Sequence, residues 1–174
     1  MNQDNEFVAS PGAPAAETKP FAGPSGVGGW LILIAIGLII TPIRLSMFIY
    51  SAYVPLFNSG AWSILTTPGT ERYHWAWKPL LLLEIFGNAA FVVWPIVLLF
   101  LLFTRSRRFP RMMIAYFIAN LVFIALDLLA VASLPNTGDA AAGLIPDLVR
   151  SILICAIWVP YFLVSVRVKN TFTQ

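Results

Sequence analysis

Charged residues are scarce in this chain. Of its 174 residues only 11% are Asp, Glu, Lys or Arg, whereas 59% are hydrophobic. A soluble domain typically has about a quarter of its residues charged, so this chain has too little polar surface to cover a water-soluble globule of its size. The composition therefore excludes a soluble protein and indicates an integral membrane protein, with the lipid bilayer as its surroundings.

Cysteine and histidine are nearly missing as well. The chain has one cysteine, Cys155, and one histidine, His74. A single cysteine forms no internal disulfide, and no group of residues has the spacing of metal ligands. The sequence has no Ser-His-Asp set, HExxH motif, phosphate-binding loop or pair of catalytic acids. We therefore expect no metal, no cofactor and no enzymatic activity.

Four long apolar runs are what the sequence does contain, each of about 20 residues, which is the length a helix needs to cross a bilayer. They predict an all-α integral membrane protein, a bundle of four transmembrane helices. The thirteen-residue segment PNTGDAAAGLIPD between the last two runs is predicted to form a turn. The predicted spans cover about residues 29–50, 79–103, 112–134 and 148–166.

The basic residues outside the spans predict the orientation. One side of the membrane carries Lys19, Arg105, Arg107, Arg108, Arg111, Arg167 and Lys169, and the other only Arg72 and Lys78. Because Lys-rich and Arg-rich loops stay in the cytoplasm, both termini are predicted to be cytoplasmic. Apart from Lys19, the residues of the basic side also suit anionic lipid headgroups. A short basic loop between two spans is not a nucleic-acid groove, so we expect no nucleic-acid partner.

Residues 1–26 differ in composition from the rest of the chain. They are rich in Pro, Ala and Gly and contain no apolar core and no basic start, so they do not form a signal peptide. We expect a disordered cytoplasmic tail there. The four-span membrane domain is predicted to cover residues 27–172.

One charged residue lies inside each predicted span, and the four lie at similar depth. At 1.5 Å per residue, Arg44, Glu84 and Asp127 each lie on the order of 10 Å below the outer surface, and Arg150 lies near it. Polar side chains in a membrane helix face other helices, since lipid offers them no hydrogen bonds. Helical spacing adds two amides to the same faces. The predicted polar layer consists of Arg44, Glu84, Asn88, Asn120, Asp127 and Arg150.

Two interpretations of this polar layer remain open. In the first, the charges pair across helices and hold the bundle together, either as Arg44–Glu84 with Asp127–Arg150 or as Arg44–Asp127. The balance of signs favours this one. The small size of the chain, its short loops and the lack of exposed chemical groups favour a non-enzymatic accessory or scaffold protein of the cell envelope, acting through a membrane partner or its own oligomer. In the second, the layer lines an outward-facing cavity. A small transporter or channel subunit would then use the carboxylates as ion or proton sites.

Two motifs resemble a known family. The first span opens with Gly28-Gly29-Trp30-Leu31, and the chain ends in a Y-x3-S-x-RVK-x-TF pattern from Tyr161 to Phe172. Over about residues 27–172 the chain resembles the DUF2569 family of small bacterial four-span proteins. The resemblance implies the bacterial cytoplasmic (inner) membrane and no particular activity.

The C-terminal pattern also has a physical interpretation of its own. Arg167 and Lys169 suit the end of a helix at the cytoplasmic surface. We expect Phe172 to fold back onto the membrane surface there. The alternative is that the pattern is a docking motif for a cytoplasmic partner.

Overall fold

The computed structural model of the chain describes residues 26, 28–135 and 137–173, which form helices and no strands. Four of these helices are long and apolar enough to cross a membrane, which confirms the predicted all-α, four-span fold. Of the expected disordered tail, every residue except Gly26 lies outside the described residues. The helices are α1 (Trp30–Asn58), α2 (Ala61–Thr66), α3 (Trp77–Phe103), α4 (Phe109–Ala132), α5 (Gly138–Val164) and α6 (Val166–Thr171).

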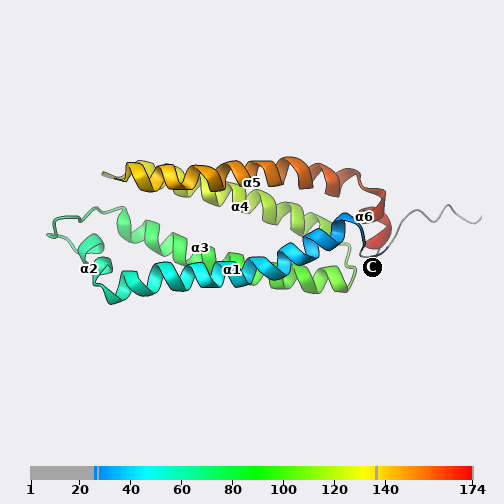
Figure 1. Cartoon of the computed structure of the whole chain (residues 1–174), viewed down its shortest axis with the longest axis horizontal. Helices are drawn as coiled ribbons and strands as arrows, with labels where there is room; N and C mark the ends of the chain where they lie inside the picture. Colours follow the sequence, from blue (N-terminus) through cyan, green and yellow to red (C-terminus); the bar gives the residue numbers. More distant parts are fainter. Residues whose placement is uncertain (1–25, 27, 136, 174) are drawn as a thin grey trace, which may run out of the picture.

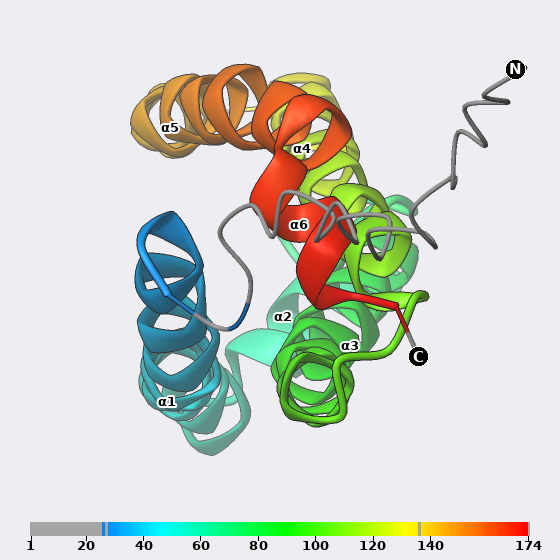
Figure 2. The same cartoon turned by 90° about the vertical axis from the view of Figure 1, so that its right-hand side faces the viewer.

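The four long helices form an open arc. α1 packs on α3, α3 on α4, and α4 on α5. Viewed from the end of the bundle, α1 and α5 are the two outer members of the arc (Figure 2). α1 begins, α5 ends and α6 lies at one end, called here the terminal end, and α2 lies at the other, the distal end (Figure 1). At the terminal end Trp30 of α1 meets Trp158 of α5 edge-on, with ring centroids 6.1 Å apart.

Two helices, α1 and α5, extend well beyond their predicted spans, whereas the bounds of α3 and α4 differ from the prediction by three residues or fewer. α1 continues to Asn58 and stops where Gly60 adopts a left-handed conformation with φ 74°. α5 begins at Gly138, so the prediction of a turn is wrong for residues 138–147. This segment contains three consecutive alanines, the strongest helix formers. The hydroxyl of Thr137 closes the remaining short turn by hydrogen-bonding to backbone carbonyls near the end of α4.

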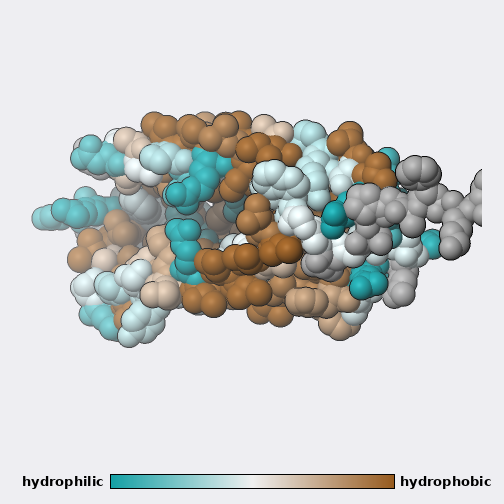
Figure 3. Space-filling model, turned by 45° about the vertical axis from the view of Figure 1, so that its right-hand side comes forward, coloured by the Kyte–Doolittle hydropathy of each residue, from teal (hydrophilic) through white to brown (hydrophobic). Residues whose placement is uncertain are grey.

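The buried side chains form two clusters, one toward each end of the bundle. The larger one fills the terminal half, where Leu31, Leu98, Leu102 and Phe109 are inaccessible to solvent. The smaller one, at the distal end, consists of Leu80, Val131 and Leu134. Most other large apolar side chains are exposed and form the hydrophobic outer surface visible in Figure 3, which suits contact with lipid.

The segment after α5 folds back under the terminal end. Ser165 leaves the helical conformation, and its hydroxyl accepts a hydrogen bond from the Val168 N–H, which caps α6. Val168, Thr171 and Phe172 are buried, and the Phe172 ring stacks on Phe109 with centroids 4.7 Å apart. Phe172 therefore packs on the bundle. The expectation that it folds back onto the membrane surface is wrong. Its burial also removes it from the surface that a docking partner would contact.

The glycine motif before α1 meets this C-terminal segment. The guanidinium of Arg167 lies against Gly28, where an added Cβ would come within 2.7 Å of Nη1. The hydroxyl of Thr171 accepts a hydrogen bond from the Gly26 N–H at 3.0 Å. The two motifs that carry the family resemblance are thus one structural unit. We call this unit, residues 26 and 28–29 with 165–172, the terminal clasp.

Two glycines of the membrane helices give a matched pair of stability predictions. A Cβ added at Gly87 of α3 would overlap the ring of Phe123 on α4, whereas one added at Gly37 of α1 would meet no atom within 4 Å. We expect Gly87→Ala to lower the free energy of unfolding by about 1 to 3 kcal/mol through overpacking. Gly37→Ala is expected to leave it unchanged or raise it by up to about 1 kcal/mol through helix propensity.

The measurement is thermal unfolding of the two purified variants in one detergent. Equal melting temperatures for the two alanine variants would show that α3 and α4 are not in the close contact described here.

Candidate functional site

A cavity of about 750 Å³ lies inside the arc, between the two buried clusters. Figure 3 shows a hollow in the hydrophobic surface with hydrophilic groups on both sides. All four long helices contribute to the lining. The six residues of the predicted polar layer all line it: Arg44 from α1, Glu84 and Asn88 from α3, Asn120 and Asp127 from α4, and Arg150 from α5.

The two carboxylates lie beside one another. Glu84 and Asp127 are on adjacent helices and close enough to interact, and the Tyr53 hydroxyl of α1 lies beside them. Both carboxylates are partly buried. The Oδ1 atom of Asp127 is buried without a hydrogen-bond partner among the described residues. A partly buried acidic pair of this kind is costly unless it binds a proton or a cation.

The two arginines do not neutralise this pair. Arg44 and Arg150 are both exposed. Within the described ranges the one ion pair closer than 4.0 Å joins Arg150 to Asp147 of the same helix, at 3.9 Å. The structure thus has neither of the expected cross-helix arrangements. Helix order is not the reason, because α1 packs on α3 and α5 packs on α4. The exposed arginines lie at another level along the bundle than the carboxylates.

The charges lie at two levels along the bundle. Counting from the helix ends at the terminal end, Arg44 and Arg150 each lie about 21 Å along their helices at 1.5 Å per residue. By the same count Glu84 and Asp127 lie about 27 to 29 Å along theirs. The acidic level is therefore nearer the distal end than the basic level, a separation that the sequence analysis did not resolve.

Neutral polar groups of the cavity join neighbouring helices. The Asn88 side chain donates a hydrogen bond to the Tyr53 hydroxyl at 3.0 Å, which links α3 to α1. The Ser151 hydroxyl donates to Asn120 Oδ1 at 3.2 Å, which links α5 to α4. Sequence reasoning missed Tyr53 and Ser151. Tyr53 follows the predicted end of the first span, although the apolar run AYVPLF there was a signal that the helix continues.

The predicted headgroup residues lie at the terminal end of the bundle, outside the cavity. Arg105, Arg107 and Arg108 are exposed in the connection between α3 and α4, and Arg111 is exposed in the first turns of α4. Lys169 is exposed on α6, whereas Arg167 is partly buried in the terminal clasp. Exposed cations gathered at one end of a membrane bundle suit anionic headgroups.

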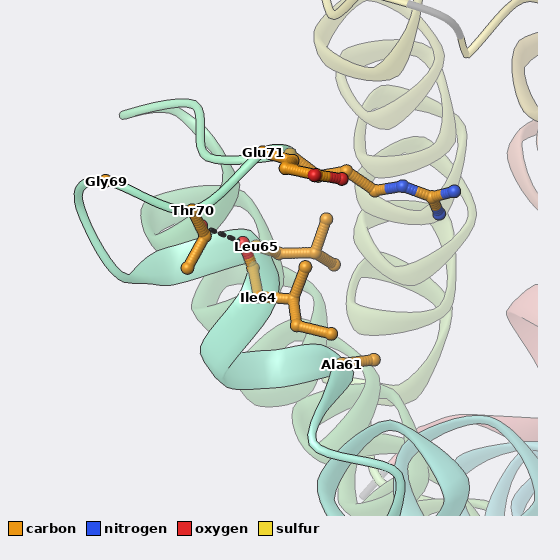
Figure 4. Close-up of a pocket in the computed structure, with 7 residues that line it drawn as sticks. Ala61, Ile64, Leu65, Gly69, Thr70 and Glu71 are labelled. Atoms are coloured by element: carbon orange, nitrogen blue, oxygen red, sulfur yellow. Dashed lines mark hydrogen bonds between the residues drawn. The ribbon is translucent and has the colours of Figure 1, made fainter.

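A second pocket, of about 600 Å³, lies between α2 and the turn that follows it (Figure 4). The Thr70 hydroxyl there donates a hydrogen bond to the Ile64 carbonyl, and the charged residues of the lining are Glu71 and Arg72. None of the predicted site residues lines it. Nor do the described residues contain a group of three or more His, Cys, Asp or Glu side chains that could hold a metal ion. The cavity inside the arc is therefore the candidate site.

Comparison with known proteins gives a family and no function. The model of a family described as proteins of unknown function, DUF2569, matches residues 24–173, which is nearly the whole chain. Among curated proteins and among solved structures, none matches the chain.

Proposed function

Because the chain belongs to the DUF2569 family, whose function is unknown, we propose its role from the cavity: it is a small transporter, or the ligand-binding subunit of one, that binds a cationic group at Glu84 and Asp127. The observation that carries this proposal is that the two carboxylates lie together in a cavity of about 750 Å³ without an arginine partner among the described residues.

The volume and lining of the cavity support a small molecule as its ligand. Sites for small molecules typically enclose 300 to 1,000 Å³ and combine apolar walls with a few placed polar groups. The aromatic rings of Phe91, Tyr116 and Phe123 line this cavity together with the polar layer. A ligand that bears a positive charge and an apolar body would find both kinds of partner.

The placement of the protein in the cell is part of the proposal. We place it in the bacterial inner membrane with both termini in the cytoplasm, on the charge asymmetry of its loops. The cavity then lies toward the outer side. We further propose that it has no catalytic activity of its own. The accessory or scaffold role, favoured by the small size and short loops of the chain, is the alternative. The exposed arginines provide no support for it from pairing of the intramembrane charges.

Binding of a hydrophobic cation tests the proposal directly. We expect the purified protein in detergent to bind radiolabelled tetraphenylphosphonium ion, measured by equilibrium dialysis. Glu84→Gln combined with Asp127→Asn should weaken that binding at least about tenfold, equivalent to about 1.4 kcal/mol, because the counter-charges are gone. Glu71→Gln is the matched control, since Glu71 is an exposed carboxylate outside the cavity.

Equal binding by the wild type and the double variant would contradict a cation site at these carboxylates. If the wild type binds no cation and instead copurifies from native membranes with one stoichiometric protein, the accessory role is favoured.

A further inference from the structure

The arrangement of charges around the cavity, together with its open side, identifies a class of ligand. We propose that the cavity binds an aminophospholipid of the outer leaflet, with its phosphate at Arg44 and Arg150 and its ammonium group at Glu84 and Asp127. The lipid reaches the cavity from the side, between α1 and α5. This inference rests on the proposed cation site and adds the identity of the ligand and its route.

The open side of the arc is the first argument. α1 packs on α3 and α5 on α4, and the two outer helices meet at the terminal end through Trp30 and Trp158. Figure 2 shows them as the separate edges of the arc. The large buried cluster fills the terminal half of the bundle, so the opening lies between this cluster and the distal end. A cavity that opens between two membrane helices faces lipid, so its most abundant potential ligand is a lipid.

The second argument is the position of the arginines. Arg44 and Arg150 line the cavity from the two helices that flank the opening, and both are exposed. A guanidinium group is a good partner for phosphate because its planar set of donors matches the phosphate oxygens. In the proposed complex these two arginines, on opposite sides of one opening, bind a single phosphate group. The Asp147 carboxylate lies 3.9 Å from Arg150 and competes with that anion for Arg150 alone.

The third argument is the order of the charges along the membrane normal. The carboxylates lie about 6 to 8 Å nearer the distal end than the arginines, at 1.5 Å per residue. With the distal end outward, a lipid of the outer leaflet has its acyl chains toward the bilayer centre, then its phosphate, then its amine. The protein presents the same sequence of surfaces in the same direction, from apolar walls through two arginines to the carboxylates, of which Asp147 is a third.

Apolar side chains are available for the acyl chains. Ile40 of α1 and Ile154 of α5 line the cavity on the side of the arginines that faces the terminal end. Farther along both helices, exposed apolar residues continue the same surface toward the bilayer. A soluble aminophosphate compound has the same headgroup chemistry but leaves these walls in contact with water, which the hydrophobic effect disfavours.

Titration with lipids of defined headgroup tests this assignment. We expect native mass spectrometry of the delipidated protein to show that dioctanoyl phosphatidylethanolamine binds at least about tenfold more tightly than dioctanoyl phosphatidylglycerol, which lacks the amine. Arg44→Gln with Arg150→Gln should weaken the binding of both lipids. Glu84→Gln with Asp127→Asn should remove the preference between them. Arg72→Gln, outside the cavity, is the matched control.

Three results would overturn the inference. One is equal binding of both lipids by the wild type, and another is unchanged binding by the arginine variant. The third is binding of O-phosphoethanolamine as tight as that of the lipid, which would assign the site to a soluble ligand. Tetraphenylphosphonium binding without any headgroup preference would support the cation site and contradict only the assignment of an aminophospholipid as its ligand. If the protein neither binds tetraphenylphosphonium nor prefers a headgroup, the proposed function is contradicted as well.

Discussion

Replacement of Phe109 by alanine is expected to lower the free energy of unfolding by about 3 kcal/mol or more. Phe109 opens α4 and has an exposed fraction of 0%. Its ring stacks on Phe172 and lies edge-on to Phe162, with centroid distances of 4.7 and 5.9 Å. Truncation would leave a cavity where α4, α5 and the terminal clasp meet, and the buried neighbours can close it only in part. The measurement is chemical or thermal unfolding in detergent.

Phe103→Ala is the control for this prediction. Phe103 ends α3 at the same end of the bundle but is 68% exposed, so its removal costs little packing inside the protein. Phe172→Ala should fall between the two, because it removes one of the two aromatic partners of Phe109. Similar melting temperatures for the Phe109 and Phe103 variants would mean that the packing of Phe109 against α5 and the terminal clasp does not contribute to stability.

Replacement of both carboxylates by amides is expected to raise the melting temperature while it removes ligand binding. An unpaired charged side chain within the membrane costs about 2.5 to 3.5 kcal/mol on insertion scales. Glu84 and Asp127 lie side by side without a cation from the described residues, so Glu84→Gln with Asp127→Asn relieves this cost. The expected gain is about 1 to 3 kcal/mol, measured as thermal stability of the ligand-free protein. Sites that bind ligands are commonly stabilised when their charges are removed.

The sign of this change separates the two interpretations of the polar layer. If Glu84 were paired with Arg44, Glu84→Gln would lower the melting temperature, and adding Arg44→Gln would partly restore it. With Arg44 exposed and unpaired to Glu84, Arg44→Gln should have little effect in either background. Glu71→Gln controls for the loss of one negative charge. A clear loss of stability in the Glu84 and Asp127 variants would support the structural role.

The sequence was sufficient to predict the four spans and six of the polar residues that line the cavity. Both depend on local signals: runs of apolar residues of bilayer length, and polar residues that share a depth and a helix face. The pairing of the charges was not predictable in the same way. It depends on how far each helix is shifted along the bundle axis relative to its neighbours, and the sequence does not give the level of Arg44 and Arg150 relative to Glu84 and Asp127.

The length of α5 and the terminal clasp are two further features that the sequence did not predict. The Pro and Gly residues of PNTGDAAAGLIPD suggested a turn, yet Pro146 lies inside α5. A proline is tolerated inside a membrane helix where surrounding groups satisfy the backbone carbonyl that it leaves free. The cations of the C-terminal motif suit lipid headgroups, and this predicted a position of the motif at the membrane surface. Thr171 of this motif contacts Gly26, which lies 145 positions earlier in the chain. A contact between residues so far apart leaves no local signal in the sequence.

The terminal clasp also has a consequence for biosynthesis. Its first half precedes α1 and its second half follows α5, so all four spans are synthesised between them. Helices that leave the ribosome in order can insert and pair as α1 with α3, α3 with α4, and α4 with α5. The Arg167 and Thr171 contacts with the glycines wait until the last helix has been translated. A chain that is cut short after α5 keeps all four spans but lacks every contact between the two ends of the chain in the terminal clasp.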